Sequence, residues 1–334
     1  MQIFLATIFS LILFGGVFIT SERFMNIEND AKAYFIGVTV ILLLLVCSIT
    51  RKGLSRLNVA LHSQGISIGF ATICLMLSVY GLFQYFGIEK SGHYAFPITG
   101  TYENPAGFAA VQAAMFPFAF ILCFDRERTN ITRLFAVTVS TLCIITVILS
   151  GSRTGVLAIC AGSMVVIVFK TKVLSLFKAY RWLWIPLVVV TVAALILLYQ
   201  VKASSADGRL FIWKICMDMI ADSPLIGYGM GGFHKHYMNA QATYFSLYPN
   251  SPYVMLADNI THPFNEYIKL IVNYGIVGLA VAITLLVWIV RKLFKSDSRT
   301  KVIGLAVTAS IFILCQFSYP VSYTHLTLPT IYPV

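Results

Sequence analysis

Charged residues are scarce in this chain, and so are cysteines outside its apolar stretches. Each shortage excludes a class of protein. Only 11% of the 334 residues are charged and 58% are hydrophobic, and a mean hydropathy of +0.83 excludes an ordinary soluble domain. Six of the seven cysteines lie inside apolar stretches, and only Cys216 lies in a long connecting segment. The sequence therefore offers no disulfide framework and no cysteine metal site. It also lacks internal repeats and low-complexity linkers, which favours a single domain.

Nine long apolar stretches contain most of the hydrophobic residues. Most approach the ~20 residues with which a helix crosses a ~30 Å hydrocarbon layer, and those near ~16 residues need help from flanking residues. Continuous apolar runs are not typical of barrel strands, so helices are expected to satisfy the backbone in lipid. The sequence therefore predicts an all-α polytopic membrane protein with about nine transmembrane helices. The nine stretches are residues 3–19, 34–50, 66–86, 106–124, 134–150, 155–169, 183–199, 268–290 and 302–317.

Lysine and arginine gather in alternate segments between these stretches. Four segments, at 51–56, 126–133, 170–181 and 291–301, hold 15 of the 24 Lys and Arg residues. The positive-inside rule places them in the cytoplasm, so the N-terminus is expected to be cytoplasmic. The segment 201–267 is then one large external loop, long enough to contain short helices. The net charge of +11 is attributed to the basic segments that set the topology and to affinity for anionic lipid, not to nucleic-acid binding.

Residues 1–320 are expected to form a single helical membrane domain, and residues 321–334 do not fit it. The stretch 322–330 reads SYTHLTLPT, which is neither a span nor a basic loop and resembles the translation of a sequencing-library adaptor. We expect a non-native tail, a native frame that is cut near Pro320, and further helices missing after it. A short external tail is the alternative interpretation.

The external loop carries two predicted helix starts. Asp207 is a plausible N-cap for a helix over residues 210–221 that ends before Pro224. A second start is predicted at His262, because the proline that follows it is favoured at the first position of a helix. That helix continues into the span at 268–290.

Two arginines could bind an anionic group. Arg153 lies in the turn 150–155 between two spans, where a guanidinium can fork onto a phosphate or carboxylate; the alternative is an arginine that binds lipid headgroups. Arg209 is predicted at a helix start, four residues before Trp213, where its charge opposes the helix dipole. By position alone a solvated charge at the helix end is the favoured interpretation. The unfavourable placement is evidence for the alternative, a separate role such as holding a pyrophosphate or a sugar-lipid headgroup.

His262 offers the most specific chemistry. At a helix N-cap the dipole lowers the pKa of an imidazole, and a neutral histidine can act as a general base near pH 7. The N–H groups of the same turn could hold a phosphate. Asn265 and Glu266 follow within one turn. A structural capping histidine is the alternative.

The sequence gives only weak signals for a metal or a nucleotide. The glycine-rich run 227–232 follows no predicted strand, which argues against a dinucleotide site. His234 and His236 have no third ligand nearby in the sequence, and Glu28 with Asp30 forms an acidic pair in a predicted external loop. We expect neither a metal nor another cofactor.

The ordered motifs resemble the O-antigen ligase and O-antigen polymerase superfamily of bacterial envelope enzymes. The resemblance extends over roughly residues 35–290. The motifs that carry it are residues 100–105, 150–155, Gly208-Arg209 with Trp213, 223–229 and 262–267.

The resemblance implies a metal-independent inverting glycosyltransferase with about twelve helices in the bacterial inner membrane. Such an enzyme moves a glycan from undecaprenyl diphosphate to an acceptor hydroxyl, for example on lipid A–core, at the periplasmic face. Its partners are the lipid-linked glycan, an acceptor glycolipid or glycan, and membrane lipid, without nucleic acid. A polymerase of the same superfamily is one alternative. An envelope lipid or polysaccharide transporter is another, but the sequence shows no paired repeats with broken helices.

The resemblance also implies site residues. The arginines of the family that grip the diphosphate match Arg209 and Arg153, and the family's essential histidine stands beside the asparagine of the last motif. Here Phe264 occupies the position before that asparagine, so His262 is the histidine that remains. The predicted catalytic residues are therefore His262, Arg209 and Arg153. The predicted substrate-binding residues are Asn265, Glu266, Trp213 and Asn104.

Reporter fusions would test this topology directly. Fusions after Arg133 and Lys295 should report cytoplasm, and fusions near Lys90 and Tyr244 should report periplasm, because lysine and arginine alternate in density along the chain. A cytoplasmic signal from Tyr244 would overturn the predicted side of the site.

Overall fold

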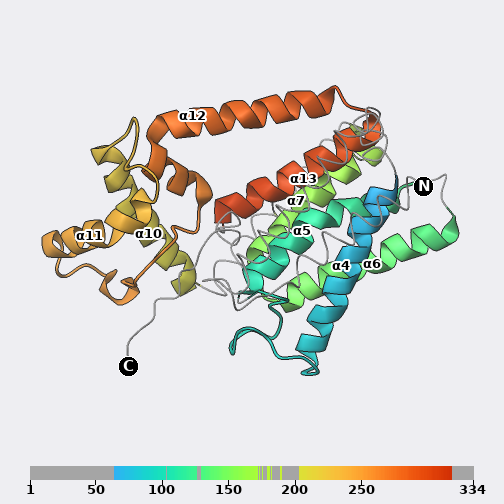
Figure 1. The fold of residues 1–334 in the computed structure, drawn as a ribbon, viewed down its shortest axis with the longest axis horizontal. Helices are drawn as coiled ribbons and strands as arrows, with labels where there is room; N and C mark the ends of the chain where they lie inside the picture. Colours follow the sequence, from blue (N-terminus) through green and yellow to red (C-terminus); the bar gives the residue numbers. More distant parts are fainter. Residues whose placement is uncertain are drawn as a thin grey trace, which may run out of the picture. The chain divides into compact units, whose positions relative to one another are not determined.

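The computed structural model describes residues 64–171 without 103 and 126–128, a few positions between 173 and 189, and residues 203–317 (Figure 1). Every regular element among these residues is helical, which confirms the predicted all-α fold class. Four predicted segments lie outside the described residues, namely 3–19, 34–50, most of 183–199, and 321–334.

Six of the described helices are long and apolar enough to cross a membrane, and each coincides with a predicted span to within about four residues at either end. They are α4 (Gln64–Tyr85), α5 (Pro105–Leu122), α6 (Asn130–Leu149), α7 (Arg153–Lys170), α12 (Glu266–Phe294) and α13 (Ser298–Phe317). The other described elements are α10 (Ala203–Asp222), α11 (Gly232–Leu247) and the 3-10 turn η2 (Val254–Leu256).

The chain divides into two compact units. The first unit contains α4 to α7 and residues 296–314, and the second unit contains residues 171–295 and 315–319. The single domain predicted over residues 1–320 stays a prediction.

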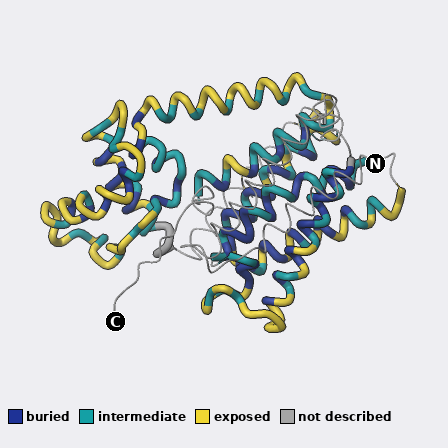
Figure 2. The backbone as a smooth tube through the Cα atoms, in the orientation of Figure 1, coloured by how far each residue is buried: buried dark blue, intermediate teal, exposed yellow. Residues whose placement is uncertain are grey.

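In the first unit, α5 packs against α4, α6 and α7, and Figure 2 shows buried residues concentrated along this bundle. Ala109 and Phe116 of α5 are fully buried. A side chain at Gly155 of α7 would overlap Ala109, so this pair of small residues allows the two helices to approach closely. Buried polar groups add bonds between helices: Gln112 Nε2 donates to Ser78 Oγ at 2.9 Å.

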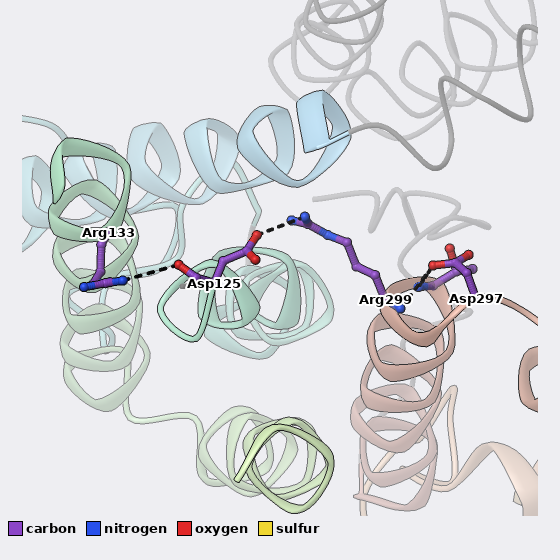
Figure 3. A network of polar contacts seen from close by, with 5 residues as sticks. Asp125, Arg133, Asp297 and Arg299 are labelled. Atoms are coloured by element: carbon purple, nitrogen blue, oxygen red, sulfur yellow. Dashed lines mark hydrogen bonds and ion pairs between the residues drawn. The ribbon is translucent and has the colours of Figure 1, made fainter. Parts of the chain in front are cut away.

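Asp125 joins the starts of two helices at one end of the first unit (Figure 3). Its carboxylate lies 3.1 Å from Arg299 Nη1, and its backbone carbonyl accepts a hydrogen bond from Arg133 Nη2 at 3.4 Å. Asp297 accepts from the backbone N–H of Arg299 at 3.1 Å and so caps α13. The two arginines come from basic segments that the sequence places on the same side of the membrane. They lie at the same end of the bundle, as that alternation of charge requires.

The second unit has an aromatic and aliphatic core shared by α10, α11 and the start of α12. Phe211 and Met219 of α10, Tyr237 of α11 and Val272 of α12 are each at most 2% exposed. The predicted external loop therefore contains a packed helical body, and the first turns of α12 belong to it.

The predicted start of the first loop helix is wrong. α10 begins at Ala203, so Asp207 is not its N-cap and Arg209 lies inside the helix. A glycine at position 208 costs about 1 kcal/mol relative to alanine within a helix. The burial of Phe211 and Ile212 in the core offsets that cost. The predicted end is right, because α10 stops at Asp222 before Pro224.

α12 is broken at Gly275, and residues 223–231, which we call the strap, lie against the break. Gly275 has φ 62° and ψ −162°, outside the helical region. Four backbone hydrogen bonds join the strap to the helix. Beyond the break, α12 donates two of them, from Ile276 N to Pro224 O (2.9 Å) and from Val277 N to Leu225 O (3.2 Å). Before the break, the strap donates the other two, from Tyr228 N to Val272 O (2.9 Å) and from Gly229 N to Asn273 O (2.7 Å). Backbone groups at the break are thereby paired.

α11 receives its N-terminal cap from α12. Gly231, at the N-cap position, has φ 75° and makes no side-chain cap bond. Asn273 Oδ1 accepts instead from the backbone N–H of Phe233 at 2.9 Å, and Asn273 is 7% exposed. The break therefore organises both the strap and the start of α11.

Two glycines of the strap provide a matched test of this packing. Gly227 (φ +64°) and Gly229 (φ +80°) both need the left-handed region, but a Cβ would meet the backbone of Val272 and Asn273 only at Gly227. Gly229→Ala should therefore cost only the conformational penalty of about 1–2 kcal/mol. Gly227→Ala should also disturb the neighbouring backbone bonds, at about 1 kcal/mol each. Thermal unfolding of both variants in detergent measures the difference, and equal losses would contradict the tight contact.

Candidate functional site

A cavity of about 250 Å³ lies within the second unit, between α10 and the segment that leads into α12. Its lining includes Arg209 and His262, two of the predicted catalytic residues. It also includes Asp258, which the sequence analysis did not single out. The lining residues are Gly208, Arg209, Ile212, Asp258, Asn259, Ile260, Thr261, His262 and Phe264.

The segment before α12 is fixed by contacts of its backbone. Trp213 Nε1, on α10, donates to the carbonyl of Pro263 at 2.8 Å. Phe264 has φ +54°, an uncommon conformation for a residue other than glycine. Asn265 is 3% exposed, and its Oδ1 accepts from the backbone N–H groups of Tyr267 and Ile268 at 2.9 and 3.0 Å. These contacts fix the segment that carries His262 against α10.

The predicted N-cap at His262 is wrong. α12 begins at Glu266 and its N-cap is Asn265. The positive φ of Phe264 interrupts helical geometry between the histidine and the helix. The side chain of Asn265 is short enough to bond the first-turn N–H groups directly. His262 therefore lies one turn before the helix, in the cavity wall.

Burial keeps His262 neutral. It lowers the pKa of the imidazole from 6.5 to about 4, with smaller electrostatic contributions from Lys269 and His234. The predicted direction of the shift agrees, but its main cause is desolvation and not the helix dipole. At pH 7 the imidazole can accept a hydrogen bond or a proton.

Contacts with Phe317 and Phe264 hold Arg209 at the cavity. Its Nη1 donates to the carbonyl of Phe317 at 3.0 Å, and its guanidinium carbon lies 5.1 Å from the centre of the Phe264 ring. Such a cation–π contact attracts the guanidinium to the face of the ring. Since Arg209 lies inside α10, its charge does not oppose a helix N-terminus, and that part of the sequence argument is wrong.

The other predicted residues of the second unit do not line the cavity. Trp213 bonds the carbonyl of Pro263, and Asn265 caps α12. Glu266 lies 3.8 Å from Lys269, one turn along α12. Direct contact of these three residues with substrate stays a prediction.

Arg153 and Asn104 belong to the first unit. Arg153 is the first residue of α7 and follows a turn in which Gly151 has φ 72°. Asn104 caps α5, accepting from the backbone N–H of Ala106 at 2.9 Å. Because Gly155 of α7 approaches α5 near its start, both helix starts lie at the same end of the first unit. A joint clamp of Arg153 with Arg209 stays a prediction.

Within the described ranges, no three His, Cys, Asp or Glu side chains gather closely enough to hold a metal ion. Glu28 and Asp30, the acidic pair considered from the sequence, lie outside these ranges.

Comparisons with known proteins point to one family. Residues 136–283 match the family model described as O-antigen ligase. The match contains every predicted site residue except Asn104. A protein of Rickettsia conorii (strain ATCC VR-613 / Malish 7), provisionally named as a polysaccharide ligase, is 25% identical over 122 residues. That alignment covers 36% of this chain and 28% of the length of the relative. Residues 136–283 are thus similar to the O-antigen ligase family, which confirms the resemblance along that stretch.

Proposed function

We propose that the protein transfers a glycan from undecaprenyl diphosphate to an acceptor hydroxyl, such as one on lipid A–core, and that the reaction takes place at the Arg209–His262 cavity. The observation that carries the proposal is the meeting of these two residues in one cavity within the matched family region. The reaction faces the periplasm of a bacterial inner membrane, in keeping with the distribution of lysine and arginine.

The chemistry needs positive charge beside the leaving group and one base. The acceptor oxygen attacks the anomeric carbon and inverts it, while the bond from that carbon to the diphosphate oxygen breaks. Arg209 stabilises the charge on the departing diphosphate. His262 takes the proton of the attacking hydroxyl. Diphosphate leaves readily, so neither a general acid nor a metal ion is required.

The low pKa of His262 makes the strength of this base depend on whether the donor is bound. An imidazole with a pKa of about 4 is neutral in the resting enzyme but is a weak base. A bound diphosphate brings negative charge near the ring, which favours the protonated form and raises the pKa. Donor binding therefore strengthens the base at the moment when the acceptor must be deprotonated.

Asp258 is the rival base in the same cavity. Its Oδ1 accepts from the backbone N–H of Asn259 at 2.7 Å, and a carboxylate could also take the acceptor proton. Its negative charge would repel the diphosphate, whereas a neutral imidazole would not. We therefore assign the base to His262.

A transporter is the second candidate, and the break of α12 is the observation in its favour, since broken helices bind substrates in many transporters. At Gly275, however, the backbone groups on either side are bonded to the strap. They are not left to coordinate a substrate. A polymerase of the same superfamily would use the same donor chemistry with a glycan acceptor.

Removal of the cation should stop transfer. Arg209→Ala should lower the rate by about 100-fold or more, the loss typical of one donor to a developing anion. Arg209→Lys should restore only part of it, since an ammonium lacks the planar fork. Arg153→Ala should behave like Arg209→Ala if both arginines grip the diphosphate. A transfer assay on purified enzyme measures all three.

Lys235→Ala is the matched control, because it removes the same charge from an exposed position of the second unit outside the cavity. It should keep the wild-type rate. Normal transfer by Arg209→Ala would exclude Arg209 from the site.

Removal of the base should separate His262 from Asp258. His262→Gln keeps hydrogen bonding but cannot take a proton, so it should lose transfer while it still binds the lipid-linked donor. Asp258→Asn should keep most of the rate. The opposite pattern would assign the base to Asp258. Loss of wild-type activity on adding a chelator would instead indicate a metal-dependent reaction.

The pH dependence should reveal the coupling between donor and base. Protonation of His262 removes the base, so activity should fall as the pH drops. For kcat/KM, which reports the free enzyme, the fall should centre near the pKa of about 4. For kcat, which reports the donor complex, it should centre at a higher pH. Coincident profiles would show that the donor leaves the pKa of the base unchanged.

A further inference from the structure

The strap presents apolar side chains that no other described residue of the second unit covers. Leu225, Ile226 and Met230 are 65%, 72% and 83% exposed. Residues 223–233 include no lysine, arginine, aspartate or glutamate. A contiguous exposed apolar segment of this kind marks a contact with lipid or with another protein.

The length of α12 beyond the break sets the depth of the strap. Arg291 and Lys292 end the apolar part of the helix and mark one boundary of the hydrocarbon layer. Residues 276–290 extend over only about 22 Å at ~1.5 Å per residue, whereas the hydrocarbon layer is ~30 Å thick. Gly275 therefore lies several ångströms inside the opposite boundary, and so does the strap bonded to it.

The backbone at the break fits this depth. In hydrocarbon an unpaired N–H or C=O group costs several kcal/mol, and a break in a helix would create such groups. The strap supplies partners on both sides of Gly275. Just beyond the break, Ile276 and Val277 are 54% and 55% exposed, and the exposed face of α12 continues along the helix in Figure 2. The apolar surface of the strap is therefore continuous with a helix that spans the membrane.

We propose that the strap is a membrane-inserted wedge whose side chains at Leu225, Ile226 and Met230 contact the acyl chains of the leaflet farther from Arg291. It anchors the second unit to lipid in addition to the span itself. The partner is a phospholipid bilayer, and the inference does not depend on the proposed glycan transfer.

Site-specific photo-crosslinking tests the wedge. The full chain is reconstituted in vesicles of phosphatidylethanolamine and phosphatidylglycerol whose acyl chains carry an alkyne tag. A benzophenone amino acid is placed at Ile226 or Met230. The matched controls are Leu247 and Met255, which are 69% and 91% exposed on the same unit outside the strap. Val281, 56% exposed on α12, shows that the assay detects lipid.

Ile226, Met230 and Val281 should label with acyl chains several-fold above Leu247 and Met255. Two strap positions guard against misfolding of one variant. Labelling of both strap positions at the control level would overturn the proposal. Crosslinks from the strap to protein in place of lipid would also overturn it. Control positions that label as strongly as the strap would do the same, because the contact would then not be specific to residues 223–231.

Discussion

The hydrogen bonds between the strap and the broken backbone of α12 hold the second unit in its present form. They allow one helix to serve two environments: the part before Gly275 lies in the aromatic core with α10 and α11, and the part beyond it is apolar and exposed. An unbroken helix would leave the strap without partners. It would also move Asn273 away from the start of α11, which has no other side-chain cap. The left-handed conformations of Gly227 and Gly275 are required where the two backbones touch.

The candidate site depends on the same core. Packing of α10 against α12 brings Arg209 into the same cavity as His262. Trp213 fixes the segment that carries His262 through a hydrogen bond to Pro263. The burial that stabilises this arrangement also lowers the pKa of His262. Stability and a neutral base thus have one physical origin. With the strap among the acyl chains, the start of α12 lies at most about 14 Å from the break, near the headgroup layer, where the diphosphate of a lipid-linked donor would lie.

The sequence predicted what depends on local composition. Long apolar runs identified the six described spans, and charged segments at 126–133 and 291–301 predicted the end of the bundle where Arg133 and Arg299 meet Asp125. The arginine and histidine of the cavity were also predicted, through their resemblance to a family pattern. α11 was not predicted, although its buried residues Phe233, Tyr237 and Tyr244 recur at helical spacing. Its glycine-rich start and many polar residues obscured the pattern.

What the sequence did not predict depends on contacts between distant segments. Asn265 and His262 are both plausible caps in the sequence, and only the positive φ of Phe264 decides between them. The break at Gly275 results from pairing with a strap about fifty residues earlier in the chain, which local propensity does not encode. Asp258 is the only charged residue between 253 and 260, and no spacing rule would have associated it with Arg209.

A cryo-electron microscopy structure of the protein with undecaprenyl-diphosphate-linked glycan in a lipid nanodisc would show directly where the donor binds. Density for the diphosphate is expected within hydrogen-bond distance of the Arg209 guanidinium, with the anomeric carbon facing His262. Diphosphate density elsewhere on the protein, with the Arg209–His262 cavity empty, would contradict the proposed site.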